Sequence, residues 1–138
     1  MMEVRKTTPE DMEYVLENAI DPQAKTVPQN IFTQPCFTGL WEGKIMGVGG
    51  INWYWEGVGE GWIILTKNTQ DNPAGSYRTI KMLFKSVLKE DFQRIQAVVR
   101  TDWKQANKMV KKLGFKKEGK LRKYCPNGDD AWIYSIIK

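Results

Sequence analysis

Helix-like and strand-like apolar patterns alternate along this chain, and the alternation limits the folds that it can adopt. Apolar residues recur at helical spacing in three stretches, and seven others alternate or are wholly apolar, as strands are. We expect strands over 3–6, 37–41, 44–55, 62–66, 95–99, 115–124 and 131–137, and helices from Thr8 to Asp21, from near Tyr77 to Leu88 and over 103–113. The order β-α-β-β-β-α-β-α-β-β predicts an α/β (α+β) fold, with a mixed, mostly antiparallel sheet of six to seven strands and helices on both faces.

Local end signals support several of these elements. Thr8 is typical of a helix N-cap, with Pro9 in the first helical position and Asp11 three residues after the cap. Asn127-Gly128 favours a tight hairpin between the last two strands. Residues 22–36 hold three prolines and predict a loop with one helical turn.

Length and composition exclude several classes of protein. The 138 residues suffice for a single domain, 1–138, with one buried core. The sequence has no histidine, which excludes the Ser-His-Asp and Cys-His schemes and histidine metal sites, and we expect no metal. Cys36 and Cys125 lie far apart and fit a reducing compartment. No apolar run reaches the length of a membrane span, so we expect a cytoplasmic protein with no membrane partner.

The positive charge is concentrated near the C-terminal end. Residues 103–123 hold nine bases and one acid, a net charge of +8, whereas the whole chain carries +5. Such a stretch can bind an anionic partner, and it is also typical of a solvated helix face followed by a solvated strand. Both interpretations stay open at this point.

Particular residues in the last third add a family resemblance to the element order. They are Ala106, the run Lys112-Leu113-Gly114-Phe115, the run Glu118-Gly119-Lys120-Leu121-Arg122, the pair Asp129-Asp130 and the run Tyr134-Ser135-Ile136-Ile137. In this order and spacing they resemble the helix, "LGF", "EG", hairpin and closing strand of the GNAT superfamily of acyl-CoA-dependent N-acyltransferases. The resemblance spans the whole chain and is specific in its last third. The chain is also similar to small, diverged GNAT-like proteins of tailed phages.

The resemblance implies acetyl-CoA as the co-substrate. In the family it lies where two parallel strands separate, which here are 62–66 and 95–99. The backbone of the first strand pairs with the pantetheine amides, as an added strand would. The pyrophosphate lies on backbone N–H groups where a loop enters the next helix. The residues so assigned are Ile64, Leu65 and Thr66 for the pantetheine and Gly75, Ser76, Tyr77 and Arg78 for the pyrophosphate.

The phosphate loop departs from the family pattern R/Q-x-x-G-x-G/A. Gly75 keeps the middle glycine, whereas Asn72 and Tyr77 stand at the outer positions. Pro73 supplies no N–H donor, although Arg78 offers a charged fork for a phosphate. The alternative interpretation is a plain helix-capping loop.

Catalytic candidates follow from what acyl transfer requires. The family's usual Asn and Tyr of the last helix are replaced by Trp103 and Val110, so an acid must come from elsewhere. A protonated amine needs a general base, and Glu60 is the first candidate with Glu56 second. Tyr124 is the candidate acid. The alternative is that both acids are merely exposed in a glycine-rich turn and that Tyr124 is a packed hairpin aromatic.

Three functions remain open on the sequence alone. The first is an N-acetyltransferase that transfers an acetyl group from acetyl-CoA to a primary amine of a small molecule or protein, by direct attack in a ternary complex. The second is a catalytically diverged binding protein, a phage or host-interaction module. The third is a nucleic-acid binder that uses the basic 103–123 stretch.

Overall fold

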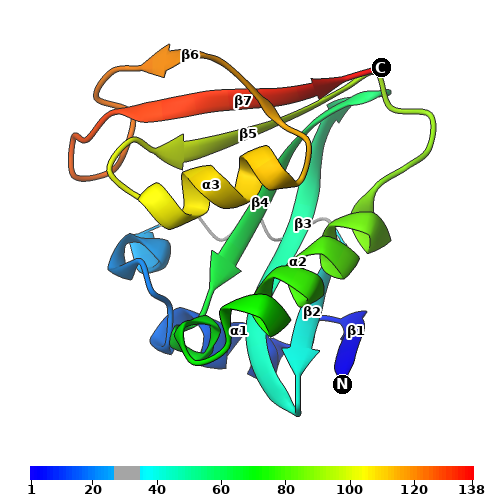
Figure 1. Ribbon diagram of the computed structural model, residues 1–138. Coiled ribbons are helices and arrows are strands. Elements are labelled where there is room, and N and C mark those ends of the chain that lie inside the picture. The colour runs from blue at the N-terminus through cyan, green and yellow to red at the C-terminus, as the bar shows by residue number, and fades with distance from the viewer. Residues whose placement is uncertain (27–34) are drawn as a thin grey trace. The chain divides into compact units, whose positions relative to one another are not determined.

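The computed structural model describes residues 1–26 and 35–138, and Figure 1 shows the arrangement of its helices and strands. Its elements are β1 (Met2–Lys6), α1 (Pro9–Glu17), the 3-10 helix η1 (Pro22–Thr26), β2 (Cys36–Trp41), β3 (Lys44–Trp55), β4 (Val58–Leu65), the 3-10 helix η3 (Lys67–Gln70), α2 (Pro73–Val87), β5 (Arg94–Arg100), α3 (Lys104–Lys112), β6 (Lys116–Leu121) and β7 (Ala131–Ile137). The expected order is confirmed. η1 is the helical turn expected after residue 22, and the rest of that loop, 27–34, lies outside the described residues.

The strands form one sheet in the order β1-β2-β3-β4-β5-β7-β6. The pairs β1–β2, β2–β3, β5–β7 and β6–β7 are antiparallel, whereas β4–β5 is parallel. A parallel pair needs a crossover connection, and α2 lies in the connection between β4 and β5. The predicted fold class, a mixed and mostly antiparallel sheet, is therefore confirmed.

The chain divides into two compact units. The first comprises Met1–Ile51 and Ile63–Leu88, and the second comprises Asn52–Trp62 and Lys89–Lys138.

In the first unit, helices cover both faces of β2. Successive residues of a strand point to opposite faces. The Thr38 hydroxyl donates to Asp11 of α1, while the next residue, Gly39, lies against Thr79 of α2. The expectation of helices on both faces holds in this unit.

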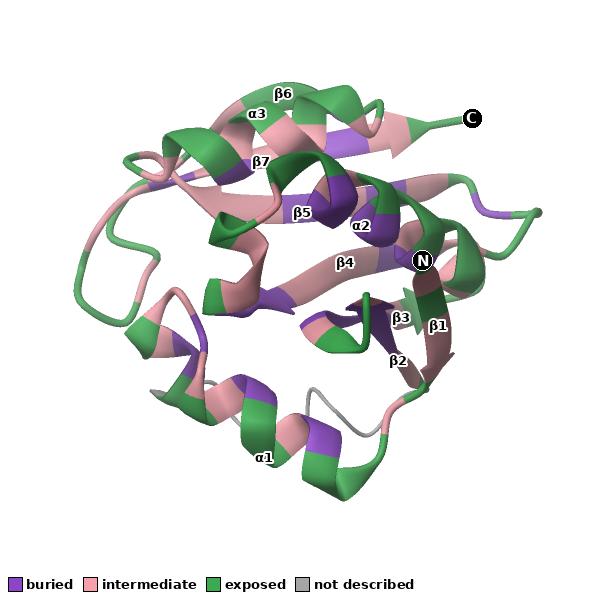
Figure 2. Ribbon diagram, turned by 60° about the horizontal axis from the view of Figure 1, so that its bottom comes forward, coloured by how far each residue is buried: buried purple, intermediate pink, exposed green. Residues whose placement is uncertain are grey.

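Close backbone approach explains the glycines of this unit. A Cβ on Gly39 would lie 2.7 Å from Thr79 Cγ2, and a Cβ on Gly47 would lie 2.7 Å from the Ile64 carbonyl oxygen. The middle of β3 is buried throughout, from Met46 to Ile51 (Figure 2). Side chains at these glycines would push the packed elements apart.

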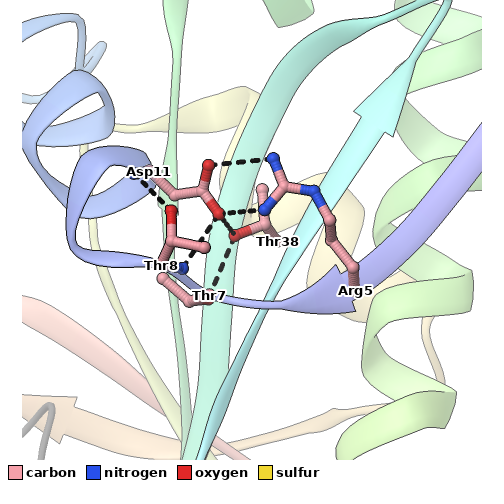
Figure 3. A network of polar contacts seen from close by, with 5 residues as sticks. All are labelled: Arg5, Thr7, Thr8, Asp11 and Thr38. Atoms are coloured by element: carbon pink, nitrogen blue, oxygen red, sulfur yellow. Dashed lines mark hydrogen bonds and ion pairs between the residues drawn. The ribbon is translucent and has the colours of Figure 1, made fainter.

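A saturated polar network fixes the start of α1 (Figure 3). Thr8 and Asp11 form a capping box: the Asp11 N–H donates to Thr8 Oγ1, and the Thr8 N–H donates to Asp11 Oδ2. The Asp11 carboxylate also accepts from Thr38 Oγ1 (2.9 Å) and from both terminal guanidinium nitrogens of Arg5, Nη1 and Nη2. Burial alone would raise the pKa of Asp11, but these donors lower it to about 2.

In the second unit, β7 lies between β5 and β6, and α3 packs against β5. Ile95 and Ala97 of β5 are buried, as is Tyr134 opposite Ala97 on β7. The Tyr134 hydroxyl donates to Asn107 Oδ1 of α3 at 2.6 Å. This bond identifies the face of β5 and β7 that α3 covers.

Two helix boundaries differ from the expected ones. The first helix ends at Glu17 instead of near Asp21: Asn18 is its C-cap, with φ of −112° and ψ of 15°, and its side-chain N–H also donates to the Tyr14 carbonyl. The second helix begins at Pro73 rather than near Tyr77, with Asn72 as its N-cap. The expected phosphate loop is therefore the first turns of α2.

Two strand boundaries also differ. β4 begins at Val58 and not at Trp62, so Gly59 and Gly61 lie in a strand and not in a turn. The cause is tertiary pairing with β5, which outweighs the turn preference of the glycines. β6 ends at Leu121, before Tyr124, because Lys123 adopts a left-handed conformation with φ of 55°.

Candidate active site

The parallel pairing of β4 with β5 is short. Its register joins Val58 to Arg94, Gly59 to Ile95 and Glu60 to Gln96. Both strands continue beyond that point, and the second unit also holds Gly61, Trp62 and the rest of β5. Pairing thus ends after Glu60, before 62–66, the segment that the resemblance places along the gap between the two strands.

Glu60 occupies the last paired position of β4. Its Oε1 accepts a hydrogen bond from Gln96 Nε2 at 2.9 Å and another from the Tyr54 hydroxyl at 3.1 Å. Both bonds fall on one oxygen. Among the residues that the structure describes, Oε2 receives no hydrogen bond, so this oxygen can accept one from a ligand or a water.

Tyr54 stays a hydrogen-bond donor over the whole physiological range. Burial and the negative charge of Glu60 raise the pKa of Tyr54 to about 12. The residue is 51% exposed, and its neighbour Trp55, with ring centroids 5.9 Å apart, is 67% exposed. The carboxylate therefore lies beside a partly exposed aromatic surface.

Tyr124 belongs to the same surroundings although it lies in a loop. Burial and the charge of Glu60 raise its pKa, and Tyr124 in turn contributes to the raised pKa of Tyr54. Its side chain is 54% exposed. The structure thus brings together two of the three predicted catalytic residues, Glu60 and Tyr124, around a hydroxyl that the sequence did not single out.

Glu56, the third predicted catalytic residue, is fully on the surface side of the turn that joins β3 to β4. The turn also contains Gly57, with φ of 84°. Within 1–26 and 35–138, no hydrogen bond joins Glu56 to Glu60, Tyr54 or Gln96. Its predicted role has less geometric support than that of Glu60.

A chain of polar side chains holds Gln96 in place. Gln96 Oε1 accepts from Arg94 Nε at 3.1 Å, and Arg94 grips both oxygens of Glu118 at 2.9 and 2.6 Å. Glu118 also accepts from Ser135 Oγ at 2.7 Å. The hydrogen bonds from Arg94 and Ser135 lower the pKa of Glu118 to about 2. With its oxygen engaged by Arg94, the Gln96 amide directs its NH₂ group at Glu60.

One edge of the β4 backbone faces away from β3, and the resemblance assigns the pantetheine arm to this strand. The Thr66 N–H donates to the Met46 carbonyl of β3, so by alternation Ile64 also faces β3, and Ile63 and Leu65 face away. The Leu65 carbonyl on that edge already accepts from the Ile20 N–H at 2.9 Å. Of the predicted set Ile64, Leu65 and Thr66, only Leu65 presents its N–H on the edge away from β3.

Gly75 and Ser76 are buried in the first unit. The Gly75 N–H donates to Asn72 Oδ1 at 2.9 Å, and a Cβ on Gly75 would lie 2.5 Å from the Trp41 ring. Ser76 Oγ donates toward the carbonyls of Asn72 and Thr69. The glycine is thus explained by packing against an indole, and the plain capping interpretation accounts for these two residues.

The other two predicted phosphate ligands lie further along α2. Tyr77 is half-buried and Arg78 is exposed. An anion at the start of α2 would have the Ala74 N–H, the helix dipole and the Arg78 guanidinium available, and it would have to displace the Asn72 cap to reach the Gly75 N–H.

Sequence reasoning missed Tyr54 and Gln96. Both point at Glu60 because of register: Gln96 is the direct partner of Glu60, and Tyr54 lies on the other arm of the β3–β4 hairpin. Neither carries a motif. A correct placement of the β3–β4 turn at Glu56-Gly57 would have found Tyr54.

The fold is that of the GNAT acetyltransferases. A GNAT-family acetyltransferase of Streptococcus pneumoniae superposes with a TM-score of 0.71 at 15% identity, covering 100% of both chains. The ribosomal-protein-S18-alanine N-acetyltransferase of Escherichia coli gives 0.71 at 16% identity, over 99% of this chain and 94% of that one. Salmonella typhimurium yncA, solved with its cofactor acetyl-CoA, gives 0.70 at 12% identity, over 99% and 94%.

Similarity in sequence is local. No protein-family model matches the chain. The uncharacterized N-acetyltransferase YoaA of Bacillus subtilis is 50% identical over 48 residues, which is 33% of this chain and 27% of YoaA. The match thus spans about a quarter of the length of that relative.

Two further properties concern the described residues alone. Residues 1–26 and 35–138 contain no group of three or more acidic or cysteine side chains able to hold a metal ion. None of the helices that the structure describes has the length and apolarity to cross a membrane.

Proposed function

We propose that the protein is an acetyl-CoA-dependent N-acetyltransferase that uses Glu60 to accept a proton from the acceptor amine. The observation that carries the proposal is the position of Glu60. It is the last residue paired across the parallel β4–β5 seam, and two donors hold its carboxylate while one oxygen stays available.

The chemistry follows from these groups. A primary ammonium must lose a proton before its nitrogen attacks the thioester carbonyl, and a fixed carboxylate can take that proton directly or through one water. The CoA sulfur leaves as a thiolate or takes a proton from Tyr124, whose raised pKa keeps it protonated.

Acetyl-CoA acts here as a co-substrate. Arg78 and the Ala74 N–H offer a positive charge and a donor at the start of α2, in place of the full family phosphate motif. The acceptor is a primary amine on a small molecule or a protein.

Two measurements test the proposal. Isothermal titration with acetyl-CoA should give saturable heat, and release of free thiol over a panel of primary amines should depend on both substrates. Absence of heat at high micromolar acetyl-CoA would contradict the proposed activity. Saturable binding without thiol release over the panel would instead favour a binding protein that retains the cofactor.

A matched pair of variants tests the placement of the pyrophosphate. Arg78→Ala should weaken CoA binding about tenfold, since a lost charge-assisted contact costs on that order. Lys85→Ala removes the same charge from the last turn of α2 and should leave the affinity unchanged. Equal affinities in the two variants would place the phosphates elsewhere.

A further inference from the structure

A basic pocket lies between α3 and the β6–β7 hairpin, within the second unit. It encloses about 280 Å³. Its lining consists of Thr101, Lys104, Asn107, Lys108, Lys111, Lys117, Trp132 and Tyr134. Half of these residues are lysines and none is acidic. The lining therefore concentrates positive charge around one indole ring.

The lysines come from two elements that face one another. Lys104, Lys108 and Lys111 follow one side of α3 at helical spacing, and Figure 2 shows this helix largely exposed. Lys117 stands on β6 opposite Tyr134 of β7, on the face that α3 covers. Like charges this close repel one another, and an anionic ligand would relieve that repulsion.

The one acid of the basic stretch does not neutralise the pocket. Neighbouring residues of a strand point to opposite faces, so Glu118 lies on the other face of the sheet from Lys117. There Arg94 holds both of its oxygens and Ser135 donates to it. The pocket therefore keeps the full charge of its lysines.

Trp132 adds a flat π surface to this charge. The Lys117 ammonium lies 3.8 Å from its ring centroid and the Lys120 ammonium lies 5.0 Å from it. Both are flexible side chains on the exposed strand β6, so an incoming ring can take their place while their charges move to neighbouring phosphates. Stacked bases on aromatic rings, combined with a positive groove, are the basis of single-strand binding.

Positive charge also continues beyond the pocket. Lys116, Lys120, Arg122 and Lys123 follow along β6 and the loop after it, and all four are exposed. A single phosphate group needs far less charge than this, whereas a polyanion that tracks the surface uses all of it.

We propose that the pocket between α3 and the β6–β7 hairpin binds single-stranded nucleic acid, with its lysines on the phosphates and one base stacked on Trp132. The ligand is a single strand because a base can stack on the ring only when it is unpaired. The site is distinct from the Glu60 surroundings, since Glu118 and Gln96 lie on the opposite face of the sheet from Trp132.

Fluorescence anisotropy with a labelled twelve-nucleotide thymidine strand tests the phosphate contacts. Lys108→Gln with Lys111→Gln should lower the affinity at least tenfold at low salt and reduce the slope of log affinity against log salt by about 1.4, at roughly 0.7 per contact. The matched control is Lys81→Gln with Lys85→Gln, which removes two exposed charges from α2. Equal losses in both double variants would overturn the proposal.

The stacking arm uses an abasic strand of the same length and charge. The full protein should bind the thymidine strand 5- to 100-fold more tightly than the abasic one, and Trp132→Leu should abolish that preference while Trp132→Phe keeps it. If Trp132→Leu does not fold, the comparison of the two strands on the unmodified protein still decides. Equal affinity for both strands would overturn base stacking.

Two competitors exclude other ligands. Polyglutamate of matched charge should displace the strand far less well than unlabelled thymidine strand does, and saturating acetyl-CoA should leave it bound. Equal competition by polyglutamate would make the pocket a general acidic-polymer site. Displacement by acetyl-CoA would assign the pocket to the cofactor. Either result would overturn the proposal, and neither bears on whether Glu60 supports acetyl transfer.

Discussion

The protein holds two carboxylates in polar networks of opposite character. Asp11, in the first unit, is buried and uses both oxygens: Arg5, Thr8 and Thr38 all donate to it. Glu60, in the second unit, accepts two hydrogen bonds on one oxygen and lies beside half-exposed aromatic rings. A fully satisfied carboxylate stabilises a local structure, whereas a carboxylate with an open oxygen can take part in chemistry.

The contrast separates stability from activity. Removing the charge of Asp11 leaves buried donors facing a neutral group, so the free energy of unfolding should fall. Removing the charge of Glu60 leaves polar groups that water can still hydrogen-bond. Only the rate of a reaction that needs the charge should therefore fall. Single substitutions can therefore test the assignment of each carboxylate.

The largest expected effect is at Glu60. Glu60→Gln keeps the shape and should lower kcat/KM for thiol release about a hundredfold or more, the usual contribution of a general base. The free energy of unfolding should change by less than about 0.5 kcal/mol. Glu56→Gln is the control and should retain the full rate. A fully active Glu60→Gln enzyme would remove the proposed base.

The next effect is at Asp11 and should appear in stability alone. A pKa lowered from 3.8 to about 2 corresponds to about 2 kcal/mol of stabilisation at neutral pH. Asp11→Asn should therefore lower the free energy of unfolding in urea by about 2 kcal/mol, with kcat/KM unchanged in the protein that stays folded. Loss of activity in Asp11→Asn without loss of stability would contradict the assignment of Asp11 to stability alone.

The same pair of proteins should converge in acid. The folded-state pKa of Asp11 lies below its unfolded value, so its stabilisation is present above pH 4 and is lost as the pH falls toward 2. The difference in urea midpoint between the unmodified protein and Asp11→Asn should shrink over that interval. A difference that stays constant from pH 7 to pH 2 would show that the charge of Asp11 is not its source.

The smallest expected effect is at Tyr54. Tyr54→Phe removes one of the two donors to Glu60 and should lower kcat/KM about three- to tenfold, because the carboxylate loses orientation. Since the pKa of Tyr54 is about 12, the ratio of the two rates should stay constant from pH 7 to pH 10. A ratio that changes over this interval would mean that Tyr54 loses its proton during turnover.

Local signals predicted much of the fold. The cap at Thr8 and the strand Lys44–Trp55 rest on neighbouring residues, and the structure confirms them. The start of β4 could not be predicted in this way. Gly57, Gly59 and Gly61 all favour a turn, but only Gly57 has positive φ, because β5 pairs with Val58–Glu60.

The candidate site shows the same limit. Glu60 was accessible to sequence reasoning because it precedes an apolar strand, whereas Tyr54 and Gln96 reach it only through hairpin and sheet register. The sequence shows the charge of the basic stretch, but it does not show which face of the sheet each charged side chain occupies. Alternation along β6 places Glu118 on one face, and pairing with β7 places Lys117 beside Trp132 on the other.

The contact between Gly75 and Trp41 has a consequence for how this chain's evolution can be read. Any heavier residue at position 75 would collide with the indole, whatever the helix binds. Selection for folding alone would then keep the glycine in descendants that have abandoned the cofactor. A glycine kept at this position would therefore record common ancestry and not cofactor binding. Only relatives that have lost the indole together with the glycine would separate the two.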